Sequence, residues 1–187
     1  MADSNAPLPP VRRSVWIRRD PEAAFRRFTE EIGTWWPHRS HSVGGDRVVR
    51  VVFESGVGGR IFEEHDDGRR FQWGTVLGWD PPDSVVFSWH PSRSPDTAQR
   101  VTVRFAAEAG GTRLSLEHTG WEALGDLART AQRGYGLGWR GVLDVYAGRL
   151  SAVVGLTGLI SAVQRVVTRF RPGDGRDRAG GEIQPTA

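Results

Sequence analysis

The stretch WGTVLGWDPPDSVVFSWHP, residues 73–91, holds the pattern that decides the fold. Apolar and polar residues alternate on both sides of the Asp-Pro-Pro-Asp segment at 80–83, with Val85, Phe87 and Trp89 on one face of the second half. Alternation with a period of two is typical of a half-buried strand. Proline cannot donate to a strand ladder, so the central segment predicts a turn between two antiparallel strands.

The same alternation runs from Val48 to about His118. Asp67-Gly68 and Gly110-Gly111 predict two further hairpin turns, because glycine adopts the positive φ that such turns need. Adjacent strands joined by short turns form an antiparallel meander with one apolar and one polar face. Residues 11–18 predict one more strand, which precedes this region in the chain.

Helical periodicity appears on both sides of the strand region. Asp20, followed directly by proline, predicts a helix N-terminus, and the apolar spacing predicts that this helix ends at Gly33. The period returns to 3.6 over about residues 121–151, and we expect the glycines at 134–138 to break or kink that helix. A sheet with one apolar face must be covered, and only the C-terminal helix is large enough.

The length of 187 residues suits one domain with tails. We expect a flexible arm at residues 1–10, a single domain at 11–150, an amphipathic helical extension at 151–170 and a disordered tail at 171–187. The extension has a nearly heptad apolar stripe and arginines near its end. Such a helix can mediate a homodimer, bind a partner protein, lie on an anionic membrane or pack back on its own domain.

Composition excludes several classes of function. All 25 basic residues are arginine, which raises the calculated pI to about 10.4, but the net charge is only +3, so we expect no nucleic-acid partner. The chain has no cysteine, which rules out disulfides, thiolate metal sites and cysteine nucleophiles. We see no secretion signal and no apolar run of about 18 residues, so we predict a cytoplasmic protein.

Four motifs resemble a known family: DPEAAFRRFTEEIGTWWP at 20–37, VGGRIFEEHDDG at 57–68, the 73–91 stretch, and GGTRLSLEHTGWEALG at 110–125. Together with the order of elements, they resemble the START/polyketide-cyclase (SRPBCC) superfamily, in the bacterial branch related to the C-terminal domain of the activator of heat-shock protein 90 ATPase. The resemblance covers roughly residues 11–150. It implies an α+β helix-grip fold, in which a curved antiparallel sheet wraps around a long C-terminal helix.

The resemblance also implies a space between sheet and helix that often holds an apolar or aromatic small molecule. We therefore expect non-catalytic binding of such a ligand, with no cofactor and no assigned catalytic residue. Two alternatives remain open, because one fold hosts many functions. One is a protein-binding module like the chaperone-ATPase activators, and the other is a cyclase or dehydrase that uses His118.

The predicted ligand site lies on the inner face of the sheet and on the helix that faces it. Its members are Trp73, Phe87, Trp89, Phe105, His118, Trp121, Trp139 and Leu143, together with the polar pair Arg60 and Glu64. A buried Arg–Glu pair near a histidine could orient a polar ligand. The structural alternative is an ordinary filled core, with Arg60 and Glu64 in a surface ion pair.

Two other groups of residues point to structure rather than chemistry. His38 and His41 are three residues apart, but no third ligand is spaced to complete a metal site, so we predict no metal. The acidic residues Glu63, Glu64, Asp66 and Asp67 flank a predicted turn, and we interpret them as a solvated hairpin tip.

Overall fold

The computed structural model describes residues 7–91 and 93–150. Its strands are β1 (Val11–Ile17), β2 (Val48–Phe53), β3 (Arg60–His65), β4 (Arg70–Asp80), β5 (Ser84–Trp89), β6 (Gln99–Glu108) and β7 (Gly111–Thr119). The helices are α1 (Pro21–Phe28), α2 (Ile32–Trp35), α3 (His38–His41) and α4 (Ala128–Tyr146), and a 3₁₀ segment at Trp121–Leu127 precedes α4. The predicted extension at 151–170 and tail at 171–187 lie outside the described residues.

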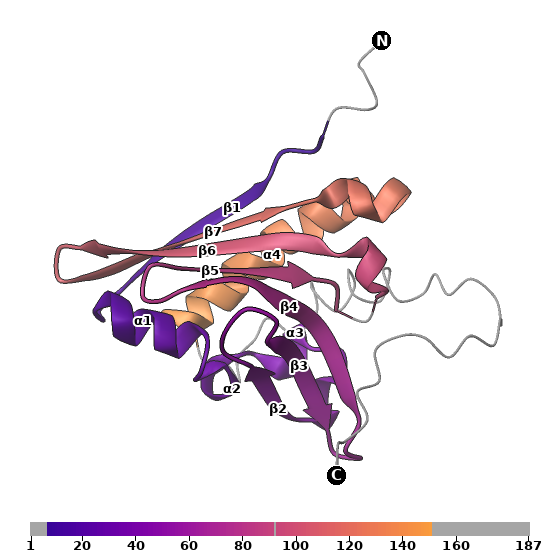
Figure 1. Ribbon diagram of the computed structural model, residues 1–187, viewed down its shortest axis with the longest axis horizontal. Coiled ribbons are helices and arrows are strands. Elements are labelled where there is room, and N and C mark those ends of the chain that lie inside the picture. The colour runs from indigo at the N-terminus through magenta and orange to yellow at the C-terminus, as the bar shows by residue number, and fades with distance from the viewer. Residues whose placement is uncertain (1–6, 92, 151–187) are drawn as a thin grey trace.

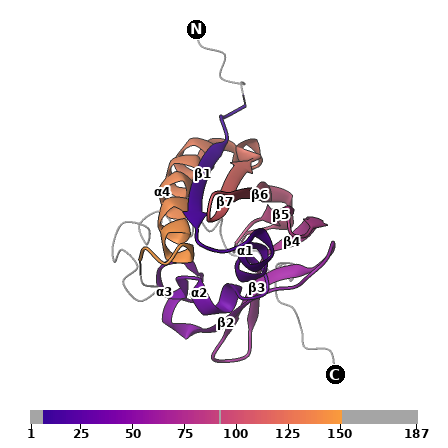
Figure 2. The same cartoon turned by 90° about the vertical axis from the view of Figure 1, so that its left-hand side faces the viewer.

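The seven strands form one antiparallel sheet in the order β1-β7-β6-β5-β4-β3-β2. The sheet curves strongly, and α4 lies along its concave side (Figures 1 and 2). Helix α1 lies across one end of the curve, and α2 and α3 lie between α4 and β2 (Figure 2). This arrangement confirms the predicted α+β helix-grip fold, because the long helix covers the apolar face of the sheet.

Local sequence signals explain most of the boundaries. The Asp20 side chain accepts a hydrogen bond from the Ala23 amide at 2.7 Å, which caps α1 as predicted. Gly68 and Gly110 have positive φ in the hairpin turns, also as predicted. Helix α1 ends at Phe28, however, and not at Gly33. The hydroxyl of Thr29 donates to the Phe25 carbonyl there, and the chain starts a new short helix, α2, at Ile32.

Irregular pairing in β2–β4 changes which side chains face the core. The register shifts between Val48 and Arg50, so Val48 is buried whereas Val49 is 60% exposed. Further shifts occur between Ile61 and Phe62 and within β4. A bulge inserts an unpaired residue and reverses the alternation beyond it, so a strict period of two does not hold along these strands.

Helix α4 runs without interruption through the glycine-rich segment 134–138, so the predicted break there is wrong. The Arg13 side chain, on the inner face of β1, donates to the Gly136 carbonyl through Nε (3.0 Å) and Nη2 (2.6 Å). A Cβ at Gly136 would lie 3.3 Å from Nη2, so the missing side chain lets strand and helix approach closely. The backbone break occurs earlier instead, at Gly125, where φ is 52°.

The described part of the chain contains no helix that is both long enough and apolar enough to span a membrane.

Candidate functional site

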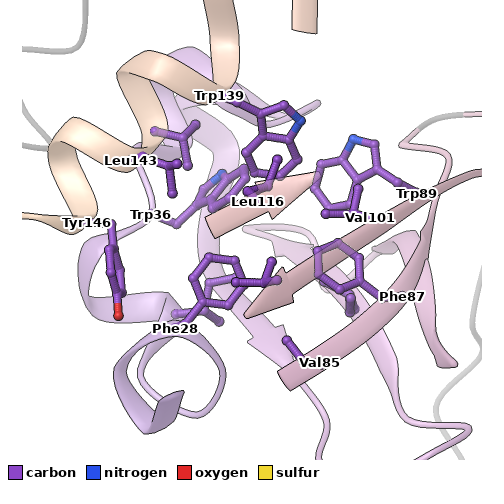
Figure 3. Close-up of a cluster of buried hydrophobic side chains, with 14 of the residues drawn as sticks. Phe28, Trp36, Val85, Phe87, Trp89, Val101, Leu116, Trp139, Leu143 and Tyr146 are labelled. Carbon is purple, nitrogen blue, oxygen red and sulfur yellow. The ribbon is translucent and has the colours of Figure 1, made fainter. Parts of the chain in front are cut away.

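An aromatic layer lies between the sheet and α4 (Figure 3). It contains eight of the ten residues predicted for the site, and all eight are buried: Trp73 on β4, Phe87 and Trp89 on β5, Phe105 on β6, His118 on β7, Trp121 in the 3₁₀ segment, and Trp139 and Leu143 on α4. The strands and the helix each supply rings to the same layer. The structure therefore brings these residues together as expected, and their role in binding a ligand stays a prediction.

Trp36, which is not among the predicted site residues, also lies inside this layer. Its ring centroid is 5.0 Å from that of Trp73, 6.0 Å from that of Trp89 and 6.2 Å from that of Trp139. Edge-on and tilted packing at these separations is favourable for aromatic rings. The adjacent tryptophans at 35 and 36, which are both buried, were the only sequence signal for this position.

His118 and Trp121 form a polar pair at one end of the layer. Both side chains are 0% exposed, and their ring centroids are 4.1 Å apart. The Trp139 indole donates to His118 Nδ1 at 3.0 Å. Within the described residues, neither His118 Nε2 nor Trp121 Nε1 has a hydrogen-bond partner. Buried polar groups are almost always bonded, so two unbonded groups side by side require an explanation.

Burial also controls the protonation of this pair. It lowers the pKa of His118 to about 3, because the charged imidazolium loses its solvation in an apolar interior. The His118 side chain is therefore neutral across the physiological range. With Nδ1 accepting from Trp139, the neutral ring carries its hydrogen on Nε2. His118 thus presents a donor, and its basic nitrogen is already occupied.

Tyr135 completes this end of the layer from the glycine-rich turn of α4. Its ring centroid is 5.0 Å from that of His118 and 5.7 Å from that of Trp121. Burial raises the pKa of the Tyr135 hydroxyl to about 12, opposed in part by the neighbouring Trp89 indole and Arg93. The Trp89 N–H lies beside this hydroxyl without the geometry of a hydrogen bond. The phenol therefore stays protonated at neutral pH.

The second buried polar cluster surrounds Glu63, which we had placed in a solvated hairpin tip. That interpretation is wrong for Glu63, which is 0% exposed. Its carboxylate accepts from the Val43 amide (2.9 Å), the Gly44 amide (2.7 Å), Trp73 Nε1 (2.9 Å) and His65 Nε2 (2.6 Å). The two amide bonds connect the loop after α3 to β3, and the bond from Trp73 connects β4 to β3. A Cβ at Gly44 would overlap the His65 imidazole, so the loop needs glycine there.

Arg60 and Glu64, the remaining two predicted site residues, face away from the aromatic layer and do not pair with each other. Arg60 pairs with Glu54 at 2.7 Å, while Glu64 pairs with Arg50 and Arg70 at 2.8 Å. Each face of β3 offers one apolar and two ionisable side chains, so hydrophobicity alone could not show which face is buried. The four hydrogen bonds that the buried Glu63 carboxylate accepts show that its face is the inner one, and the expected inward pair of Arg60 and Glu64 is not formed.

The pKa shifts of these partly exposed carboxylates follow from their arginine partners. The hydrogen bond from Arg60 lowers the pKa of Glu54, and the hydrogen bonds from Arg50 and Arg70 lower that of Glu64. Both carboxylates lie near the surface, where such pairs contribute little to stability. Among the residues that the structure describes, no group of three or more histidine or acidic side chains is placed to hold a metal ion.

A curved antiparallel sheet closed by a long helix, with an aromatic layer between them, defines the helix-grip class. Residues 18–147 match the family described as Activator of Hsp90 ATPase homolog 1-like protein, and the chain belongs to this family. The match confirms the resemblance drawn from the four motifs. No protein with a curated description matches the chain.

Solved structures extend the comparison. The chain is similar to Txn09, an anthrahydroquino-gamma-pyrone synthase, with 30% identity over 77% of this chain and 98% of that one, and a TM-score of 0.55. It is also similar to CalC from Micromonospora echinospora, a self-sacrificing resistance protein, with 28% identity over 75% and 93% of the two chains and a TM-score of 0.55. Protein MLL2253 from Mesorhizobium loti shares the fold at 21% identity, over 80% and 99% of the chains, with a TM-score of 0.53.

Proposed function

We propose that this protein binds a small apolar or aromatic molecule between the curved sheet and α4, without transforming it. One observation carries the proposal: of the six buried side-chain nitrogen and oxygen atoms without a partner in the described residues, His118 Nε2 and Trp121 Nε1 belong to two rings that lie 4.1 Å apart inside a layer of aromatic rings. A natural core rarely leaves such groups unbonded, whereas a ligand site keeps polar groups among apolar walls to orient what it binds. The name of Txn09, an anthrahydroquino-gamma-pyrone synthase, supports an aromatic ligand but does not support the absence of catalysis.

An enzymatic role for His118 as a general base has less support. Its basic nitrogen accepts from Trp139, and its pKa is lowered to about 3, which makes it a weak base at neutral pH. Among the described residues, no carboxylate hydrogen-bonds to His118. A dehydrase-type reaction that removes a proton through this ring would need a different arrangement.

A protein-binding role would use exposed apolar surface. The large exposed apolar side chains of the described region come from six separate places in the chain: Val43, Val49, Val57, Leu77, Leu137 and Leu150. Scattered apolar residues are normal on a protein surface and do not themselves mark an interface. Binding of a partner protein, dimerisation through 151–170 and the cytoplasmic location therefore remain predictions from the sequence.

Titration calorimetry with fluorene, a flat apolar aromatic probe, tests the proposal. We expect saturable binding at one site, and Trp139→Phe should weaken it by about threefold because a ring of the layer becomes smaller. Trp16→Phe makes the same change on the outer face of β1 and should leave the affinity unchanged. Absence of fluorene binding, together with a bare mass in native mass spectrometry of protein purified from its own host, would contradict the proposal.

A further inference from the structure

The chemistry of the two unbonded groups identifies what they can bind. Because His118 Nδ1 accepts from Trp139 Nε1, its Nε2 carries hydrogen, and an indole Nε1 is a donor only. Both free groups are therefore N–H donors. They lack an acceptor, which the described protein does not supply to either of them.

The surroundings restrict the acceptor further. The rings that contact this pair belong to Tyr135 and Trp139, which are neutral aromatic side chains. A fully charged carboxylate would lose its hydration in such a site at a large cost. A carbonyl oxygen on an aromatic ring system loses much less hydration, and its flat frame matches the aromatic walls.

We propose that His118 Nε2–H and Trp121 Nε1–H together bind the carbonyl oxygen of a planar aromatic ketone or quinone. This inference rests on the proposed function, because the carbonyl must enter the aromatic layer to reach the two donors. His118 acts here as a neutral donor that fixes the ligand's orientation, and no proton leaves it. A neutral imidazole that donates to a carbonyl keeps the same protonation state before and after binding.

Two probes of equal shape separate this inference from the proposed function. Fluorene and 9-fluorenone share one tricyclic frame, and only the second carries a carbonyl. A net hydrogen bond contributes about 0.5–1.5 kcal/mol, so two donors should make fluorenone bind about tenfold more tightly than fluorene. The infrared carbonyl stretch of bound fluorenone should also shift to lower frequency than in an apolar solvent.

Variants then assign the effect to the two donors. Trp121→Phe should reduce the preference for fluorenone over fluorene by about three- to tenfold, because one donor is lost. His118→Phe should reduce it similarly and serves as a second variant if the first folds poorly. Trp35→Phe is the matched control, since that buried indole already donates to the Arg27 carbonyl at 2.6 Å, and the preference should be unchanged.

The outcomes are distinct. Equal affinity for both probes, or a carbonyl stretch that is the same in wild type and Trp121→Phe, would overturn this inference and leave the proposed function standing. Failure of both probes to bind would overturn the two together. A preference for fluorenone that disappears in Trp121→Phe and persists in Trp35→Phe supports the two-donor site.

Discussion

Two buried polar clusters in the core of this protein differ in how their central groups are bonded, the Glu63 carboxylate in one and the N–H groups of His118 and Trp121 in the other. The Glu63 carboxylate accepts four hydrogen bonds, from two backbone amides and two side chains. At the other cluster, the N–H groups of His118 and Trp121 have no partner in the described chain. The Glu63 carboxylate is fully bonded within the described chain, although Nδ1 of its partner His65 has no partner there, whereas the two N–H groups of the second cluster both need an acceptor from outside. Full burial alone therefore does not separate structural from functional polar residues.

Removal of the Glu63 carboxylate should have the largest effect. Glu63→Ala leaves the Val43 and Gly44 amides and the Trp73 indole without an acceptor, and we expect a loss of about 3–5 kcal/mol in the free energy of unfolding. Denaturant unfolding measures this. Glu64→Ala, on the outer face of the same strand, removes partly exposed ion pairs and should cost less than about 1 kcal/mol. Similar losses for both variants would show that the Glu63 network is not a structural connection.

The two clusters can be compared directly through one substitution made in each. Trp73→Phe and Trp121→Phe remove the same atoms from two almost fully buried rings. Trp73 loses a hydrogen bond to a carboxylate, which contributes about 1.5–3 kcal/mol, whereas Trp121 loses no bond. We therefore expect Trp73→Phe to reduce the free energy of unfolding by about 2 kcal/mol more than Trp121→Phe. An equal loss in both variants, or a larger loss in Trp121→Phe, would show that the two clusters do not differ in this way.

Acid should destabilise the protein through His118. Its pKa is about 3 when folded and about 6.5 in an unfolded chain, so below about pH 6.5 the unfolded state binds a proton that the folded state does not. Stability from this group is complete above pH 6.5 and is lost as the pH falls toward 3. The loss between pH 7 and pH 5 is about 2 kcal/mol. His118→Phe should remove this part of the pH dependence in urea unfolding at the two pH values, and an unchanged dependence would place the histidine in a solvated site.

Much of the fold was predictable because its signals are local. The Asp20 cap, the glycine turns and the alternation of β5–β7 each depend on neighbouring residues, and the structure has all of them. The bulges in β2–β4 were not predictable, because they depend on how strands pair. The glycines at 134–138 led to the wrong prediction of a helix break, because Gly136 instead allows a close contact between α4 and the distant Arg13.

The candidate site also combines features that were predictable from local sequence with features that depend on distant contacts. Large aromatic side chains favour burial, and they mark the inner face of their strands and helix, so their burial in one layer was predictable. The inward direction of Glu63 was not, because its stabilisation comes from amides 19 and 20 residues earlier in the chain. The free donors of His118 and Trp121 could not be inferred either, since hydrogen bonds in a folded core depend on three-dimensional positions.

The difference between the Glu63 cluster and the His118–Trp121 pair can be tested most directly by NMR. The experiment follows the indole N–H signals of nitrogen-15-labelled protein during titration with 9-fluorenone. The eight tryptophans give eight such signals, which include one in each cluster, Trp121 and Trp73. We predict that the Trp121 proton moves downfield as it gains an acceptor, while the Trp73 proton, already bonded to Glu63, stays in place. A Trp121 signal that does not move in the ligand-bound protein, or a shift confined to Trp73, would contradict the assignment of the His118–Trp121 pair as the ligand site.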